Sequence, residues 1–365
     1  MLYKLKDIFD LQMGKTPSRN NIEYWNTNDY KWVSIADLTK TDKYIYDTKE
    51  YLSKKAVNES GIKIIPANTV IMSFKLSIGK TAITAEDMYS NEAIMAFHDK
   101  HIVEILPEYI FYLFKYKNWD DGSNKAVMGK TLNKAILSEV EIDICSIEEQ
   151  RKIVNVLDKI MNLISARKKE LSYLDTFTKA RFVELFGDPI INSKGLETKE
   201  LNEVLALKAG DFTAASDISV EPTEINIYPC YGGNGIRGYV AEYNQEGEYS
   251  LVGRQGALSG NVQYATGKFK NTEHALLVKP IIRMNSIWLN QLLLNLDLKR
   301  YQTGAAQPGL SVKNLQDIQI IMVPIDEQRV FADFVHQIDK SKSAVKKALD
   351  ETQLLFDSLM QEYFG

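Results

Sequence analysis

The feature that most constrains this chain is an internal repeat. The segment Ile147-Glu148-Glu149-Gln150-Arg151 recurs 178 residues later as Ile325-Asp326-Glu327-Gln328-Arg329. The same offset aligns residues 137–142 with residues 315–320. Near the start of each half the offset is 196 residues, so the first half has 18 more residues in its interior. A repeat of this length predicts two similar structural units.

Each half ends in a predicted long helix. Residues 147–186 contain neither Gly nor Pro, and Gly187-Asp188-Pro189 supplies a stop. Ser146 and Glu149 have the spacing of a capping box. At 1.5 Å per residue, each helix would be roughly 60 Å long.

Apolar residues in both helices follow the alternating spacing of four and three that is typical of a heptad stripe. Neither stripe has another obvious partner, so we predict that the two helices pack on each other as an antiparallel coiled coil. The predicted packing residues are Ile153, Leu157, Ile160, Ile164, Leu171, Leu174, Leu185, Phe331, Val335, Ile338, Val345, Leu349, Phe356 and Leu359.

The regions between the helices are mixed and rich in strands. Residues 69–74, 249–253 and 318–323 have the pattern of short buried strands, and residues 107–116 and 287–298 have helical apolar spacing. We therefore predict an α+β fold with two homologous, strand-rich globular domains separated by two long helices. The predicted boundaries are 1–146 for the first domain, 147–187 for the first helix, 188–200 for a linker, 201–323 for the second domain and 324–365 for the second helix.

Composition excludes several classes of protein. The 365 residues include 44 Lys+Arg, 48 Asp+Glu and only two Cys, which excludes a disulfide scaffold and a four-cysteine zinc site. No apolar run approaches the ~20 residues of a membrane span, and the charged N-terminus does not resemble a signal peptide. We therefore expect a cytoplasmic protein. Its net charge of −4 argues weakly against DNA binding.

Three Gly-Lys-Thr triplets, at Gly14, Gly79 and Gly129, suggest phosphate-binding loops but lack the earlier glycine that such a loop needs. Residues 233–238, Gly-Asn-Gly-Ile-Arg-Gly, match the dinucleotide-binding pattern. A strand rather than a helix is expected after them, so we predict a hairpin or recognition loop.

No other motif indicates catalysis. His98 and His101 have i, i+3 spacing, but no Cys or carboxylate set completes a metal site around them. We therefore predict no catalytic residue, no metal and no cofactor in this chain.

The net charge conceals local differences. Residues 201–248 include two basic and eight acidic residues, whereas residues 254–309 include seven basic and two acidic ones. Residues 111–134 carry five lysines against two aspartates. DNA binding needs positive charge only where phosphates are contacted, so these basic segments are compatible with it.

Arg, Asn and Gln in Gly-rich loops have the side-chain chemistry that reads base edges in the major groove. Taken singly, each is also compatible with an ordinary solvated surface residue. The predicted DNA contacts are Lys15, Arg19, Lys75, Lys80, Lys125, Lys130, Asn234, Arg237, Arg254, Gln255, Arg300 and Gln307.

Two variable regions thus alternate with two similar long helices, each introduced by a strand and an Ile-x-Glu-Gln-Arg segment. Together with residues 231–239, Tyr-Gly-Gly-Asn-Gly-Ile-Arg-Gly-Tyr, and with Arg254-Gln255-Gly256, this layout resembles the specificity subunits of type I restriction-modification enzymes. The similarity covers nearly the whole chain.

The resemblance implies two target-recognition domains, each reading one half of a bipartite site in double-stranded DNA. It also implies that the paired helices set the spacing between the half-sites and dock two methyltransferase (modification) subunits. S-adenosylmethionine and ATP/Mg would then belong to partner subunits, the latter with the restriction (nuclease and translocase) subunits.

Two other readings remain open from the residues alone. The acidic net charge favours a duplicated coiled-coil adaptor that binds protein partners without reading DNA. A stand-alone methyltransferase or nuclease would need donor or metal motifs that the sequence lacks.

Overall fold

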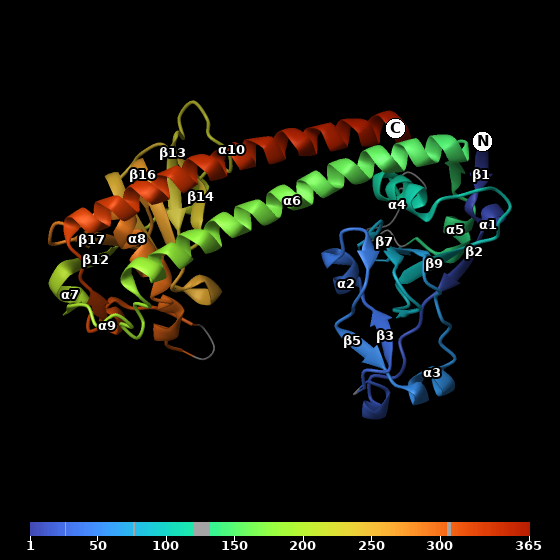
Figure 1. The fold of residues 1–365 in the computed structure, drawn as a ribbon, viewed down its shortest axis with the longest axis horizontal. Coiled ribbons are helices and arrows are strands. Elements are labelled where there is room, and N and C mark those ends of the chain that lie inside the picture. Colours follow the sequence, from blue (N-terminus) through green and yellow to red (C-terminus); the bar gives the residue numbers. More distant parts are fainter. Residues whose placement is uncertain (26, 76, 120–131, 305–307) are drawn as a thin grey trace. The chain divides into compact units, whose positions relative to one another are not determined.

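The structure is a computed structural model, and it describes all residues except 26, 76, 120–131 and 305–307. The chain forms two compact units (Figure 1). Unit 1 comprises Met1–Ala166 and Leu349–Gly365, and unit 2 comprises Arg167–Ala348. Each unit therefore includes parts of both long helices. The boundaries predicted from the sequence instead treated each long helix as a segment separate from the globular domains. The expected α+β class, with two strand-rich regions and two long helices, is confirmed.

Unit 1 is built on a five-stranded sheet with the order β2-β9-β6-β7-β4, a three-stranded sheet β5-β3-β8 and the pair β1-β10. Its strands are β1 (Leu2–Lys4), β2 (Phe9–Met13), β3 (Tyr30–Val33), β4 (Tyr44–Ile45), β5 (Glu50–Leu52), β6 (Val70–Ser73), β7 (Thr81–Thr84), β8 (Tyr89–Ser90), β9 (Ile94–Asp99) and β10 (Glu141–Asp143). Its shorter helices are α1 (Leu5–Ile8), η1 (Ile22–Tyr24), α2 (Ile35–Lys40), α3 (Lys54–Ser60), α4 (Pro107–Tyr116) and α5 (Lys134–Ser138).

The apolar run of β6 explains how this sheet is buried on both faces. Because side chains alternate along a strand, Val70 and Met72 join the core cluster that contains α4, while Ile71 joins a second cluster on the other face. Helix α4 covers β6 and β7, and its residues from Tyr109 to Phe114 are all buried.

Unit 2 has a six-stranded sheet with the order β12-β17-β15-β16-β13-β14 and the pair β11-β18. Its strands are β11 (Thr198–Glu200), β12 (Leu205–Ala209), β13 (Tyr228–Gly232), β14 (Gly235–Val240), β15 (Gln245–Gly253), β16 (Val262–Asn271), β17 (Ala275–Pro280) and β18 (Gln319–Ile321). Its shorter helices are α7 (Leu201–Val204), η2 (Ala215–Asp217), η3 (Gly256–Leu258), α8 (Ser286–Asn295), η4 (Leu298–Tyr301) and α9 (Val312–Leu315).

The sequence repeat is also a repeat of backbone hydrogen bonds. Equivalent bonds in units 1 and 2 have nearly equal lengths, so the two units share one scaffold. Three equivalent pairs are Leu5 N to Val140 O (2.9 Å) with Leu201 N to Ile318 O (2.9 Å), Lys100 N to Ile8 O (3.0 Å) with Ile281 N to Val204 O (2.8 Å), and Gly14 N to Ile94 O (3.0 Å) with Gly210 N to Ala275 O (3.3 Å).

The long helices are α6 (Ile147–Phe186) and α10 (Ile325–Phe364), 40 residues each. At the start of α6, the Ser146 hydroxyl accepts a hydrogen bond from Glu149 N at 3.3 Å, as a cap requires. Among the described residues, no helix combines the length and hydrophobicity needed to cross a membrane.

Within unit 2 the two helices run antiparallel, because higher-numbered residues of α6 contact lower-numbered residues of α10. The rings of Phe182 and Phe331 lie 5.5 Å apart, and the Arg167 guanidinium donates a hydrogen bond to Ala348 O. The 178-residue repeat aligns Lys342 with Ile164, a residue of the apolar stripe. Lys342 pairs with Asp175 of α6 at 2.6 Å, and this ion pair explains how a charged residue is tolerated between the two helices.

Within unit 1, α6 and α10 contribute to a single core cluster with α4. Ile153 and Leu157 of α6 belong to it, as does Phe356 of α10, whose ring lies 6.3 Å from that of Tyr112. In unit 2, Trp288 of α8 likewise contacts Phe182. All fourteen residues predicted for the helix pair are buried or half-buried. However, the stripes pack on α4 and α8 as well as on each other, which the sequence pattern did not indicate.

The glutamine of the repeated Glu-Gln-Arg segment is buried in both units. Gln150 is 0% exposed; its Oε1 accepts a hydrogen bond from Leu106 N (2.9 Å), and its Nε2 donates to Glu104 O (3.0 Å) and Cys145 O (3.0 Å). This side chain thus joins the first turn of α6 to the start of α4.

Gln328 makes the equivalent contacts in unit 2. Its Oε1 accepts a hydrogen bond from Asn285 N, the cap of α8, at 2.8 Å, and its Nε2 donates to Val323 O at 2.8 Å. The repeated motif is therefore explained by structure: a buried amide fixes each long helix to the domain that precedes it.

We predict that Gln150→Leu lowers the free energy of unfolding by about 1–3 kcal/mol for each buried backbone group that it leaves without a partner. Urea denaturation of the chain would measure the loss. Asn155→Leu, on an exposed position of the same helix, should change stability by less than about 0.5 kcal/mol. Equal effects of the two substitutions would contradict the assigned role.

Candidate nucleic-acid interface

The glycine-rich segment of unit 2 forms a hairpin rather than a cofactor loop, as the sequence predicts. Gly233 and Asn234 make the two-residue turn between β13 and β14. Of the Gly-Lys-Thr triplets, Gly14 follows β2 and Gly79 precedes β7, and neither opens a helix. Gly129 lies outside the described residues.

Four loops of unit 2 meet where β15 ends and β17 begins. We call residues 233–234, 254–261, 272–274 and 308–310 loop cluster 2. Hydrogen bonds join its parts: Arg254 N to His274 O (3.0 Å), Gly256 N to Pro308 O (2.8 Å), Leu310 N to Arg254 O (2.8 Å) and Asn261 Nδ2 to Asn234 Oδ1 (2.7 Å). Three of these four bonds join backbone atoms, and the fourth joins the side chains of Asn261 and Asn234.

The side chains of loop cluster 2 are planar donors and acceptors. Gln255 is exposed, and its Oε1 lies 3.2 Å from His274 Nδ1. Half-buried Arg254 donates from Nη1 to Glu273 O at 3.1 Å. Its buried Nε, like the buried Glu273 Oε2, has no hydrogen-bond partner among the described residues. The guanidinium of Arg254 and the amide of Gln255 are the types of side chain that make bidentate contacts with base edges.

Unit 1 contains the same loop on the same scaffold. We call residues 74–75, 77–80 and 91–93 loop cluster 1. Its backbone bonds match those of loop cluster 2: Phe74 N to Ala93 O (3.0 Å) with Arg254 N to His274 O (3.0 Å), Gly79 N to Ser73 O (2.9 Å) with Gly260 N to Gly253 O (2.8 Å), and Ser73 N to Lys80 O (2.9 Å) with Gly253 N to Asn261 O (2.8 Å). Gly79 and Gly260 both have left-handed φ, 86° and 82°.

The side chains differ at three of these equivalent positions. Phe74, Lys75 and Lys80 of unit 1 stand where unit 2 has Arg254, Gln255 and Asn261. The half-buried Lys75 has its Nζ 5.3 Å from the Phe74 ring centroid, and Lys80 Nζ donates to Thr39 Oγ1 at 2.5 Å. One scaffold therefore presents two different chemistries.

Two other predicted residues of unit 1 already have partners within the unit. Arg19 forms a bidentate ion pair with Glu50, and its guanidinium lies 3.7 Å from the Trp25 ring centroid. Lys15 Nζ donates to Ser60 O. These contacts fix the segment after β2, so both residues have a structural role that the sequence did not indicate.

In unit 2, Arg237 is exposed on β14 beside Gly232, and Arg300 lies in η4 with its guanidinium 5.2 Å from the Tyr301 ring. Backbone of η4 closely approaches Gly260 of loop cluster 2. Lys125, Lys130 and Gln307 lie outside the described residues.

The basic segment 254–309 does not form one surface. Ala275 at the start of β17 pairs with Gly253, but Lys279 pairs with Ala206 near the other end of the strand. Arg254 and Lys279 therefore lie toward opposite ends of the sheet, because each strand residue advances about 3.3 Å. The basic residues of this segment are therefore close together in the sequence but not in space.

Sequence reasoning missed three members of loop cluster 2: Asn261, Glu273 and His274. The repeat offers a signal for all three, since an offset of 181 residues aligns them with Lys80, Glu92 and Ala93.

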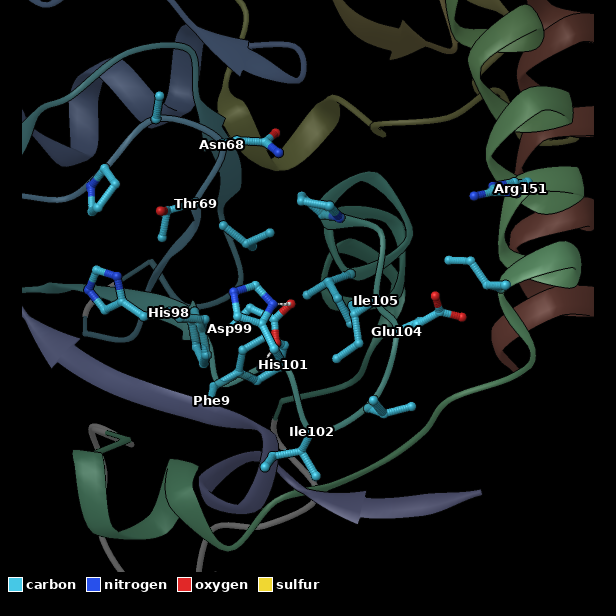
Figure 2. A pocket seen from close by; sticks show the side chains of 18 residues that line it. Phe9, Asn68, Thr69, His98, Asp99, His101, Ile102, Glu104, Ile105 and Arg151 are labelled. Carbon is cyan, nitrogen blue, oxygen red and sulfur yellow. Dashed lines mark hydrogen bonds and ion pairs between the residues drawn. The ribbon is translucent and has the colours of Figure 1, made fainter.

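A cavity of about 700 Å³ lies in unit 1 near the C-terminal end of β9 (Figure 2). His101 Nδ1 is 3.3 Å from Asp99 Oδ2 in its wall, and Arg151 reaches it from α6. Burial lowers the pKa of His98, which favours the neutral imidazole. No group of three or more potential metal ligands occurs among the described parts of the chain. We assign no chemistry to this cavity.

Comparisons with known proteins agree with this architecture. A family model described as "Type I restriction modification DNA specificity domain" matches residues 1–173 and 193–352. The specificity subunit of the type I restriction enzyme EcoprrI from Escherichia coli is 30% identical over 355 residues, which are 93% of this chain and 88% of that protein. The MjaIX specificity subunit from Methanocaldococcus jannaschii is 31% identical over 242 residues, 61% of this chain and 55% of that protein.

Solved structures share the fold. The S subunit of a type I restriction-modification system from M. genitalium gives a TM-score of 0.60 at 17% identity, covering 100% of this chain and 96% of that one. A chain from a study of assembly and conformational transition of the type I system gives a TM-score of 0.59 at 17% identity, with coverage of 100% and 97%.

We predict that Gly210→Ala disrupts the support of loop cluster 2. An added Cβ would lie 2.1 Å from Asn271 O, so backbone must move, and we expect a loss of about 3 kcal/mol in unfolding free energy. Gly309→Ala is the control: among the residues that the structure describes, its Cβ would meet only Arg254 O at 3.6 Å, an ordinary contact. Urea unfolding of both variants checks this, and a stable Gly210→Ala would refute it.

Proposed function

This chain belongs to the family of type I restriction-modification DNA specificity subunits, and we propose that each of its units reads one half of a bipartite target in double-stranded DNA. Subunits of this family recognise the DNA target and leave catalysis to other subunits. The chain therefore acts as a DNA-binding component of a restriction-modification complex.

One observation carries the proposal of two half-sites. Several backbone bonds of loop clusters 1 and 2 are equivalent, yet Phe74, Lys75 and Lys80 of one are replaced by Arg254, Gln255 and Asn261 in the other. A shared scaffold with exchanged polar side chains is what two readers of different sequences need, because backbone geometry positions the loop and side chains specify the base.

The residues suggest how each cluster contributes. Arg254 and Gln255 of unit 2 carry the fork and amide geometries that suit guanine and adenine in the major groove. Lys75 and Lys80 of unit 1 provide charge for guanine or phosphate contacts. The two half-sites should consequently differ in sequence.

The partners and cofactors follow as part of the proposal. Two methyltransferase (modification) subunits would dock on α6 and α10, whose lengths would set the spacing between half-sites. S-adenosylmethionine would be bound by those subunits, and ATP with Mg²⁺ by restriction subunits. An adaptor that binds only protein would show no steep salt dependence of DNA binding, whereas contacts with phosphate require it.

Methylome sequencing of a strain that expresses this subunit with its methyltransferase tests the proposal. We expect a split motif with one modified adenine in each half. A continuous motif, or methylation that is indifferent to sequence, would contradict it. A strain that expresses the methyltransferase without this chain is the control.

We predict that Arg254→Ala weakens discrimination at the half-site read by unit 2 and leaves the other unchanged. Loss of one bidentate contact costs about 1–3 kcal/mol, which is a roughly 5- to 150-fold loss of preference. Lys75→Ala is the matched variant in loop cluster 1 and should affect only the opposite half-site. Methylation of target libraries randomised in one half at a time would measure both, and equal losses at both halves would disprove the assignment.

A further inference from the structure

A basic groove runs along β2, an edge strand of the five-stranded sheet in unit 1. It is a cavity of about 500 Å³ with consecutive residues of β2 along one wall. Four lysines line it, Lys6, Lys63, Lys100 and Lys134, against one carboxylate, that of Asp10. The groove is therefore the kind of site that attracts an anion.

Two of the four lysines are paired with acids, and the other two are available to an external anion. The paired ones are Lys6, with Glu139, and Lys100, whose Nζ lies 3.4 Å from Asp10 Oδ1. Lys63 and Lys134 are exposed and form no ion pair with the residues that the structure describes. The internal acids thus neutralise only part of the positive charge.

The second unit shows that the fold does not require lysine at these positions. Lys100 N bonds to Ile8 O as Ile281 N bonds to Val204 O, so Ile281 occupies the position of Lys100. Lys134 begins α5 after the Asn133 cap as Val312 begins α9 after the Ser311 cap. Packing therefore does not explain why unit 1 has lysine at positions 100 and 134.

Unit 2 nevertheless places basic residues at the same edge through other positions. Its edge strand is β12, where Lys208 stands at the position of Gln12. Lys279 of β17 stands at the position of His98. The corresponding edge is thus positively charged in both units, although the basic residues stand at different positions in each.

We propose that the groove along β2 binds the phosphate backbone of the DNA duplex that flanks the half-site read by unit 1, an inference that rests on the proposed function. Strand β2 ends at Met13, and the next two residues bond to the segment beside loop cluster 1: Gly14 N to Ile94 O and Lys15 N to Ser90 O (2.8 Å). The groove therefore leads directly away from the loops that read the bases. Lysines are suitable because flexible point charges neutralise phosphates without reading sequence.

The test uses the assembled methyltransferase with Lys63→Gln/Lys134→Gln in this subunit. Two duplexes carry the target: one ends at the unit 1 half-site, and the other extends about 10 base pairs beyond it, one helical turn. Binding is followed by fluorescence anisotropy at several salt concentrations. The wild type should prefer the longer duplex.

The variant should lose that preference while methylating the same sequence. Between 50 and 200 mM salt, its affinity for the longer duplex should change less than that of the wild type, by about 3.5-fold for each phosphate that the variant no longer neutralises. Lys134→Val, which installs the residue type of Val312, gives a second test on a side chain that the repeated fold accommodates.

Lys40→Gln/Lys49→Gln is the matched control, since both lysines are exposed and line a cavity of unit 1 where three lysines face three aspartates. It should keep the wild-type salt dependence. An unchanged salt dependence in the groove variant, or an equal loss in the control, would overturn the proposal. Loss of subunit assembly with unchanged DNA binding would also overturn it and indicate an acidic protein partner. If the wild type itself ignored sequence, the proposed function would fail instead.

Discussion

Two buried side-chain amides, those of Gln150 and Gln328, fix the architecture on which recognition depends. Each satisfies the backbone at the start of α4 or α8 and in the segment between the preceding strand and its long helix. A buried amide left without partners is costly, so the bonds couple helix and globular part strongly. Because the contacts are to backbone atoms, the neighbouring side chains are free to differ between units, as Leu106 and Asn285 do.

The same principle extends to the recognition loops. Loop clusters 1 and 2 are held by backbone bonds from Ser73, Phe74 and Gly79 in unit 1 and from their counterparts in unit 2. These backbone bonds need no particular side chain, apart from the glycines with left-handed φ, although Ser73 Oγ also accepts a bond from Lys80 N and Asn261 Nδ2 donates to Asn234 Oδ1. Other side chains of the loops can therefore differ without loss of the backbone bonds.

Much of the fold was predictable because it depends on patterns that are local or repeated. The absence of Gly and Pro and the heptad spacing gave both ends of α6, and the apolar run of β6 gave a buried strand. The candidate site was harder, since it depends on which loops meet. Arg254 could be proposed from its loop, but its contact with Glu273 required the pairing of β15 and β17. The ion pair of Arg19 with Glu50 could not be predicted for the same reason, because the two residues are distant in sequence.

The near-neutral charge balance of the chain is a consequence of this construction. An exposed lysine on a loop held by backbone bonds contributes little to folding, so its position is set by what it contacts outside. Some acidic residues, by contrast, neutralise cations within the fold, as Asp158 does for Lys43 at 2.5 Å. The overall charge of −4 therefore averages two populations. Those lysines and arginines that lack an internal carboxylate, rather than the total, indicate where a polyanion binds.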